Sequence, residues 1–280
     1  MAIITISRGS MSGGEALANC LGATLGYPVL AREVLIEAAA RLGVSEELLR
    51  EKIQTTSGGF EKLREDRRIY LLALQSALAD RCVSGNLIYH GNAGHLLLKG
   101  LPTLLRVRLI ASIAARVRAV VERQGLDPEP AREYIKYVDQ ERVEWNKFVY
   151  GVDWRDPKNY DLVVNLRNVS LQAACVMISS VVMLPTYTST PEVKKQLQDF
   201  ALACRVQLAL AVDPGFRGLP FAVHADGGKV EISWQAASGA VGARPAQLNK
   251  DLIRHTAILV EGVREVTLLP ERIEPLPQAG

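Results

Sequence analysis

The chain has 280 residues, of which 48% are hydrophobic and 22% are charged, and this balance is typical of a globular protein with a large core. It excludes a disordered, collagen-like or low-complexity chain. Lysine and arginine number 33 against 30 acidic residues, which gives a net charge of +3. This excess is too small to predict a protein that neutralises many nucleic-acid phosphates, so no nucleic-acid partner is expected.

The cysteines and the apolar segments predict a cytoplasmic protein. Four cysteines lie far apart without a C-x-x-C pair, which favours buried reduced thiols over a zinc site or a disulfide framework. The amino-terminal residues lack the basic and apolar regions of a signal peptide. The longest apolar stretch, residues 171–184, is shorter than the ~20 residues that cross a bilayer.

A cluster of proline, threonine and serine at residues 184–193 predicts a linker between two domains. We place the first domain at residues 1–184, the linker at 185–190, the second domain at 191–270 and a tail at 271–280. Because few contacts should cross such a linker, we expect a protein that ends near Pro185 to stay folded.

Short β-type runs alternate with stretches of helical periodicity in the first domain. Strands are predicted at residues 2–7, 86–90, 104–111 and 160–165, and helices at 13–25, 32–42, 60–83, 113–123, 128–148 and 171–183. This alternation predicts an α/β domain of three layers with a mainly parallel sheet.

The second domain has a different order of elements. A helix at residues 192–212 precedes strands at 221–225 and 230–234, which are joined by an Asp-Gly-Gly turn. A second helix at 246–260 and a strand at 263–268 follow. We therefore expect a small α+β domain of order αββαβ.

The first strand runs directly into a loop of small residues, Arg8 to Gly14, and then into a helix. Such a loop presents free N–H groups and the positive end of the helix dipole to an anion, as in phosphate-binding loops. It is not a Walker A sequence, because Gly14 stands in place of the lysine and Glu15 in place of the Ser/Thr. A tight turn without a ligand is the alternative interpretation.

Several segments resemble the cytidylate-kinase-like family, which is related to the P-loop nucleoside monophosphate kinases. They are ITISR, SGG at the start of the first helix, LLRVRLIAS followed by Arg116, DQER, and WRDPKNYDLVVN, and they span the first two thirds of the chain. The resemblance implies a P-loop kinase fold and ATP-dependent phosphoryl transfer to cytidylate (CMP) or a similar nucleoside monophosphate. Magnesium (Mg2+) would arrive with the nucleotide.

The resemblance also implies site residues in three groups. Donor phosphates would be held by Arg8, Ser12, Gly13 and Gly14, with Glu15 beside them, Arg116 and Arg142 would act as lid arginines in catalysis, and Arg32, Asn92 and Asp139 would bind the acceptor. Positive charge around the transferred group is the main requirement of phosphoryl transfer. Surface ion pairs are the alternative role of the lid arginines. No residue is assigned as a metal ligand of the protein.

Departures from the family pattern favour a second hypothesis, a pseudokinase that binds a nucleotide or a protein partner without transferring phosphate. Met11 stands where a loop glycine is usual, Glu15 where a basic residue is common, and Asn92 where an arginine would hold the acceptor phosphate. Glu15 has two open roles. It either lies beside the phosphates, which would make ATP binding depend on Mg2+, or it stabilises its own helix through the dipole.

The second domain resembles a BON domain in VQLALAVDP, FAVHADGGKVEIS and VEGVREVTLL. BON domains are associated with phospholipid or protein binding, so the resemblance implies a partner at a membrane surface or a protein partner. We expect a regulatory or oligomerising role, with a homo-oligomer as one form. An appendage that only stabilises the chain is the alternative.

Overall fold

The computed structural model describes residues 1–54, 62–91, 93–216, 219–234 and 249–269. The chain divides into two compact units. The first consists of Met1–Glu33 and Ser84–Thr190, and the second of Val34–Val83 and Pro191–Gly280. Within the described residues, no helix is both long enough and apolar enough to span a membrane.

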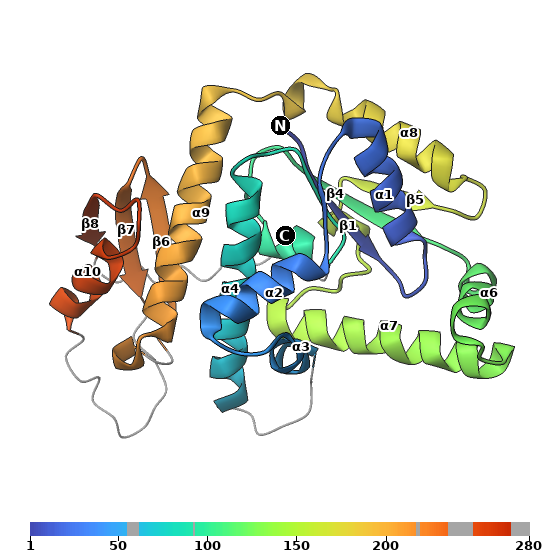
Figure 1. Ribbon diagram of the computed structural model, residues 1–280, viewed down its shortest axis with the longest axis horizontal. Coiled ribbons are helices and arrows are strands. Elements are labelled where there is room, and N and C mark those ends of the chain that lie inside the picture. Colours follow the sequence, from blue (N-terminus) through green and yellow to red (C-terminus); the bar gives the residue numbers. More distant parts are fainter. Residues whose placement is uncertain (55–61, 92, 217–218, 235–248, 270–280) are drawn as a thin grey trace. The chain divides into compact units, whose positions relative to one another are not determined.

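The first unit contains a five-stranded parallel sheet of order β2-β3-β1-β4-β5 (Figure 1). Its strands are β1 (Ile3–Arg8), β2 (Val29–Leu30), β3 (Leu87–Tyr89), β4 (Leu104–Ile110) and β5 (Leu162–Asn165). Strands β1 and β4 are in register from Ile3 opposite Leu104 to Arg8 opposite Leu109. Their carboxyl ends therefore meet at one edge of the sheet. The predicted α/β domain with a parallel sheet is confirmed.

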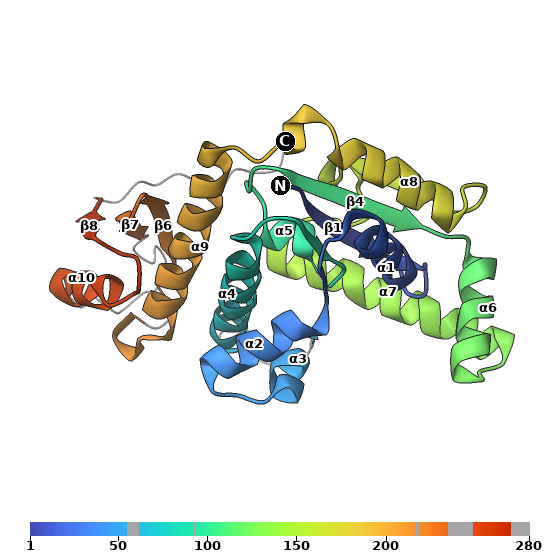
Figure 2. The ribbon, with the colours of Figure 1, turned by 45° about the horizontal axis from the view of Figure 1, so that its top comes forward.

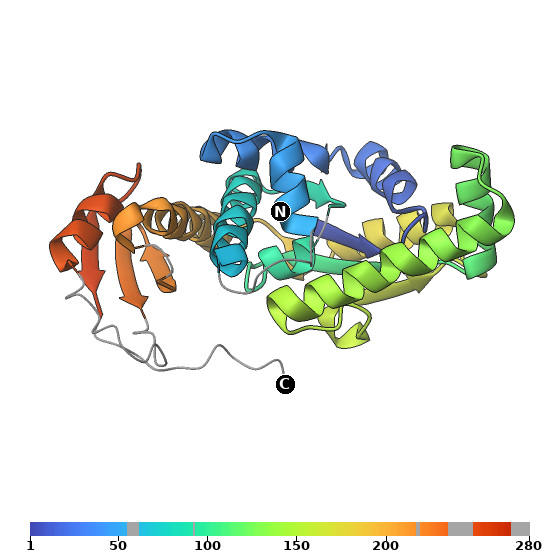
Figure 3. The ribbon, with the colours of Figure 1, turned by 90° about the horizontal axis from the view of Figure 1, so that it is seen from below.

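Helices α1 (Gly14–Leu25) and α8 (Leu171–Val182) lie against one face of this sheet (Figure 2). The core beneath them is formed by alternating strand residues such as Ile4, Val107 and Leu109 and by helix residues such as Leu17 and Ile178. Helix α7 (Pro128–Tyr150) lies across the other face (Figure 3), and α6 (Ile113–Gln124) packs against α7. One face of β4 therefore packs against the α1 and α8 core, and the other face is on the α7 side.

The two arginines of β4 face away from the α1 and α8 core. Leu105, Val107 and Leu109 are buried in that core, whereas Arg106 and Arg108 alternate with them. Because successive strand residues point to opposite faces, both arginines lie on the α7 side. That side also holds the short helix α5 (Gly94–Leu97).

The second unit is built around helices α4 (Lys62–Cys82) and α9 (Pro191–Val212), which pack together. Helices α2 (Arg32–Leu42) and α3 (Glu46–Gln54) precede α4. A sheet of order β6-β7-β8 packs on α9, and its strands are β6 (Phe221–Asp226), β7 (Lys229–Trp234) and β8 (Glu265–Leu268). Helix α10 (Lys250–Ile258) lies between β7 and β8 in sequence and contributes to the same core. Strands β6 and β7 are antiparallel and β8 is parallel to β7. The predicted αββαβ order is observed.

Residues 34–83 do not group with the domain to which the sequence analysis assigned them. Helix α4 packs on α9 through Ala79, Ala201 and Cys204. Asp80 of α4 also pairs with Arg205 of α9 at 2.5 Å. Periodicity predicts that a helix is amphipathic but does not identify the helix that covers its apolar face, and this is why the sequence missed the contact.

Two further differences concern short segments. Strand β2 and helices α3 and α5 were not predicted, because two to nine residues give little periodicity. The expected linker begins with a 3₁₀ turn, Pro185–Tyr187, whose Tyr187 carbonyl accepts a hydrogen bond from the Met1 amino group at 2.5 Å. The start of the linker is therefore attached to the first unit.

A disulfide joins Cys20 of α1 to Cys175 of α8, with the Cα atoms 6.2 Å apart. The expectation of four reduced thiols is wrong for this pair. The two residues are 155 positions apart in sequence, and they meet only because both helices lie on one face of the sheet. Cys82 and Cys204 are free and buried, and burial raises the pKa of the Cys204 thiol to about 12.

The disulfide predicts the number of titratable thiols. In denaturant without reductant, thiol titration should detect two groups, Cys82 and Cys204, and all four cysteines after reduction. Cys175→Ser should give three thiols under both conditions, because it frees Cys20. Four thiols in protein purified without reductant would contradict the disulfide.

The α4 and α9 contact reverses our expectation for a protein that ends at Pro185. Removing α9 exposes the buried surface of α4 around Ala79 and Cys82. Each lost kcal/mol lowers the Tm of a chain of this size by roughly 2–4 °C, and we expect a Tm lower by about 10 °C or more, with aggregation. A protein that ends at Leu269 keeps every described element and should melt like the full chain. Equal Tm values for all three proteins would show that the contact contributes nothing.

Candidate active site

The loop between β1 and α1 is shaped by residues in the left-handed region. Met11 has φ 55° and Gly13 has φ 81°, and Gly13 immediately precedes the first turn of α1. Ser12 lies between them with 2% of its surface exposed, and its buried Oγ has no hydrogen-bond partner. The loop therefore brings a buried hydroxyl to the positive end of a 12-residue helix.

Two loop glycines allow arginine side chains to approach the main chain. A Cβ on Gly14 would lie 1.8 Å from Cδ of Arg8, and a Cβ on Gly9 would lie 3.1 Å from Cζ of Arg116. Any larger residue at position 14 would therefore displace Arg8. The Gly-Gly pair that replaces the Walker lysine makes room for an arginine from β1.

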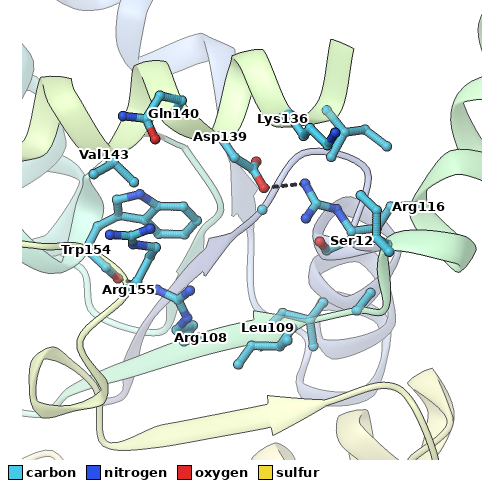
Figure 4. A pocket seen from close by; sticks show the side chains of 15 residues that line it. Ser12, Arg108, Leu109, Arg116, Lys136, Asp139, Gln140, Val143, Trp154 and Arg155 are labelled. Atoms are coloured by element: carbon cyan, nitrogen blue, oxygen red, sulfur yellow. Dashed lines mark hydrogen bonds and ion pairs between the residues drawn. The ribbon is translucent and has the colours of Figure 1, made fainter. Parts of the chain in front are cut away.

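Side chains of α6 and α7 hold the loop from outside (Figure 4). Arg116 donates from Nε to the Ser10 carbonyl at 2.6 Å and pairs with Asp139 Oδ2 at 2.6 Å. Asp139 Oδ1 in turn accepts the Ser10 N–H at 2.9 Å. Arg142 donates to the Arg8 carbonyl at 2.8 Å. Two arginines and one carboxylate thus fix the loop main chain.

The electrostatic balance around the loop is positive. Burial lowers the pKa of the Arg8 guanidinium, and the charge of Arg142 lowers it further. Burial also lowers the pKa of Arg142, where the nearby Arg116 adds to the effect and Asp139 opposes it. Buried cations that repel one another are stabilised when an anion binds between them. The site is therefore suited to an anionic ligand.

A pocket of about 340 Å³ opens where β1 and β4 end. It is lined by Gly9, Ser12, Arg108, Leu109, Ile110, Ala111, Ile113, Arg116, Ile135, Lys136, Asp139, Gln140, Val143, Trp154 and Arg155. Figure 4 shows Ser12 and Arg116 on one side of it, and Trp154, Arg155 and Arg108 on the other. The lining holds four cationic side chains and one carboxylate.

A buried polar cluster lies next to the pocket. The Tyr160 hydroxyl is 2.6 Å from the Trp154 carbonyl oxygen, 3.0 Å from Ser7 Oγ and 3.3 Å from His95 Nε2. Arg108 also donates to the Trp154 carbonyl. Burial, together with the charges of Arg106 and Arg108, lowers the pKa of His95 to about 4. His95 is therefore neutral at physiological pH and contributes no charge.

The structure places most of the predicted site residues around this loop. Ser12, Arg116 and Asp139 line the pocket, and Arg8, Gly13, Gly14 and Arg142 belong to the loop or contact its main chain. The roles expected for them stay predictions. Asn92 lies outside the described residues, and Arg32 is exposed at the start of α2 and does not line the pocket.

Glu15 pairs with Arg123 at 3.8 Å, with both side chains more than 60% exposed, and it does not line the pocket. This arrangement favours the alternative in which the carboxylate stays at the surface in the first turn of α1. Such an exposed pair contributes at most about 1 kcal/mol.

Sequence analysis missed several pocket residues, above all Arg108 and Trp154. The available signal was the alternation of Arg106 and Arg108 with apolar residues in β4, which indicates two arginines on one face of a strand. Within the described residues, no group of three or more metal-binding side chains comes together. The oxygen groups of the pocket lining come from Ser12, Asp139 and Gln140.

The low pKa of His95 predicts a pH-dependent stability. The folded value of about 4 lies below the ordinary 6.5, so the unfolded chain binds the proton first. Stability from this residue is complete above pH 6.5 and is lost as the pH falls toward 4, by about 3 kcal/mol in total. Urea unfolding of His95→Gln should show a weaker pH dependence than wild type in this range. His224→Gln, at an exposed position, is the control, and identical profiles for all three proteins would contradict the assignment.

Comparisons with known proteins agree with the fold of the first unit. Residues 3–168 match the family model described as the cytidylate kinase-like family. A cytidylate kinase of Methanopyrus kandleri is 30% identical over 173 residues, which cover 58% of this chain and 83% of that protein.

Two solved structures each match 65% of the chain. An uncharacterized protein from Eubacterium ventriosum matches with a TM-score of 0.50 and 18% identity, over 65% of this chain and 99% of that one. A shikimate kinase from Acinetobacter baumannii matches with a TM-score of 0.38 and 12% identity, over 65% and 93%. The family match extends over more than half of the chain, and this protein therefore belongs to the cytidylate kinase-like family.

Proposed function

We propose that this protein binds ATP at the β1–α1 loop and transfers its γ-phosphoryl group to cytidylate or a similar nucleoside monophosphate. The observation that carries the proposal is the surplus of positive charge at the loop. Arg8, Arg116 and Arg142 surround it, and the pocket lining has Asp139 as its one carboxylate. Phosphoryl transfer needs positive charge around the migrating group and little covalent help.

The donor phosphates would lie at the loop. The first N–H groups of α1 and the Ser12 hydroxyl would hold their oxygens, and Arg116 and Arg142 would balance the charge that develops on transfer. These arginines are already fixed on the loop main chain, so little reorganisation is needed during the reaction. Mg2+ would neutralise the β- and γ-phosphate oxygens. It would arrive with the nucleotide, and the pocket lining offers it the side-chain oxygens of Ser12, Asp139 and Gln140.

On the acceptor side, Asp139 is the predicted residue that lines the pocket. Asp139 directs both carboxylate oxygens to the loop and Arg116, so it serves first to position them. Arg32 does not line the pocket. The choice of cytidylate as acceptor rests on the family and on the similarity to the Methanopyrus kandleri protein.

One observation favours the alternative, a pseudokinase. The Asp139 carboxylate accepts the Ser10 N–H, which is a donor that a phosphate could otherwise use, and no lysine occupies position 14. A protein with this loop could bind nucleotide and pass the signal to a partner without turnover. Purified protein with ATP, Mg2+ and CMP should form CDP under the kinase hypothesis. Binding without product would select the pseudokinase.

The lid arginine provides the next test. Arg142→Met should weaken ATP binding by tenfold or more, about 1.4 kcal/mol, because a buried charge beside the loop is lost. Arg132→Met is the matched control on the same helix, since Arg132 pairs with Glu129 at the exposed surface. Calorimetric titration measures both, and a melting curve verifies the fold. Equal ATP affinity in the two variants would place the nucleotide elsewhere.

For the second unit we propose a regulatory or oligomerising role. The αββαβ order of its elements from α9 to β8 supports the resemblance to a BON domain, with a protein or membrane-surface partner as the expected ligand. The cytoplasmic location likewise remains a prediction from the sequence.

A further inference from the structure

We propose that Arg108, stacked on Trp154, holds the phosphate of the acceptor nucleotide. This inference rests on the proposed kinase function and adds a residue that neither the motifs nor the family resemblance assigned. Arg108 lies in β4 opposite Ser7 of β1, on the sheet face that carries α7, and its side chain lines the pocket.

Arg108 carries a positive charge on the pocket wall without an ion-pair partner in the described part of the chain. Its guanidinium lies 4.4 Å from the centre of the Trp154 ring and 5.6 Å from that of Tyr160, and it donates to the Trp154 carbonyl. It forms no ion pair with any carboxylate among the described residues. A guanidinium that is partly withdrawn from water without a counter-ion is destabilising until an anion binds.

The neighbouring Arg106, in contrast to Arg108, has a carboxylate partner. Arg106 lies two residues earlier on the same strand and face, and Asp161 accepts from both its Nε at 3.1 Å and its Nη2 at 2.6 Å. Asp153 lies close enough for the charge of Arg108 to help lower its pKa, but its ion pair is with Arg155 at 2.9 Å. Of the two arginines on this face of β4, Arg106 has an ion pair, and Arg108, in the pocket, has none among the described residues.

Two hydrogen-bond donors of this pair of residues have no acceptor within the described residues. Nε of Arg108 and Nε1 of Trp154 are both buried and have no partner. Each can only donate, and both residues line the same pocket as the unpartnered Ser12 hydroxyl. A ligand that satisfies them must accept hydrogen bonds, and the charge requires an anion. Phosphate oxygens meet both conditions.

The unpartnered groups lie on two opposite sides of the pocket. Ser12 and Arg116 lie on one side of the pocket, and Arg108 and Trp154 on the other (Figure 4). With the donor γ-phosphate at Ser12, an acceptor phosphate at Arg108 would face it within one cavity of about 340 Å³. An acceptor phosphate oxygen would form a bond to the γ-phosphorus while the bond to the β–γ bridging oxygen breaks. ADP leaves, and the acceptor becomes a nucleoside diphosphate.

The test compares CMP with cytidine, which differ by the phosphate alone. Calorimetric titration of the full chain should give CMP an affinity at least tenfold above that of cytidine. In Arg108→Met this advantage should disappear, while Mg2+-ATP binds within twofold of wild type. Arg106→Met is the control, because Arg106 does not line the pocket, and it should keep the CMP advantage. Arg108→Lys keeps the charge without the planar fork and should lose only part of the advantage, which preserves the test if the methionine variant does not fold.

Several outcomes would overturn the inference. They are an unchanged CMP affinity in Arg108→Met, an equal loss for CMP and ATP, and ATP binding by a wild-type protein that binds no CMP. If wild type binds neither nucleotide, the proposed function fails separately. In that case a melting titration with inorganic phosphate decides: stabilisation of wild type that is lost in Arg108→Met supports the anion site, and no stabilisation of wild type overturns it.

Discussion

The site depends on the burial of arginine guanidinium groups against the main chain of one loop. Arg116 and Arg142 reach the carbonyls of Ser10 and Arg8, and Arg8 reaches that of His90. Each bond offsets part of the cost of removing a charge from water, but a carbonyl dipole does not neutralise a cation. The loop is thereby fixed in place and left electrically positive. The buried arginines therefore determine both the conformation of the loop and its preference for an anionic ligand.

This arrangement explains how a loop without a Walker lysine can still suit phosphate. A lysine would bring one mobile charge on a flexible stem, whereas here the charge comes from planar groups fixed on β1, α6 and α7. Gly14 permits this arrangement, because the Arg8 side chain fills the space that a Cβ at position 14 would occupy. Asp139 limits the repulsion among the cations by pairing with Arg116.

The parts of the fold that local patterns encode could be predicted from the sequence. Strand β1, the small-residue loop and helix α1 follow one another along the chain, so their signal is continuous. The disulfide between Cys20 and Cys175 and the contact of α4 with α9 depend on which distant helices become neighbours, and no local pattern records this. The same limit applied to Arg108. Its alternation with apolar residues indicates its face of the sheet, but whether Arg106 or Arg108 pairs with Asp161 is decided by the register of β4 and β5.

The Asp139 carboxylate and a bound phosphate would compete for one main-chain donor of the loop, the Ser10 N–H. Its carboxylate accepts the Ser10 N–H at 2.9 Å, which is the type of contact that a phosphate oxygen makes with such a loop. A bound phosphate would compete for that donor while gaining the attraction of Arg8 and Arg142, whose pKa values stay lowered although Glu15 and Asp139 oppose the shifts. Binding would therefore be favoured by the sum of the arginine charges and opposed by one ion pair. Under the proposed function, the affinity of the loop for nucleotide would fall as the ion pair between Arg116 and Asp139 becomes stronger.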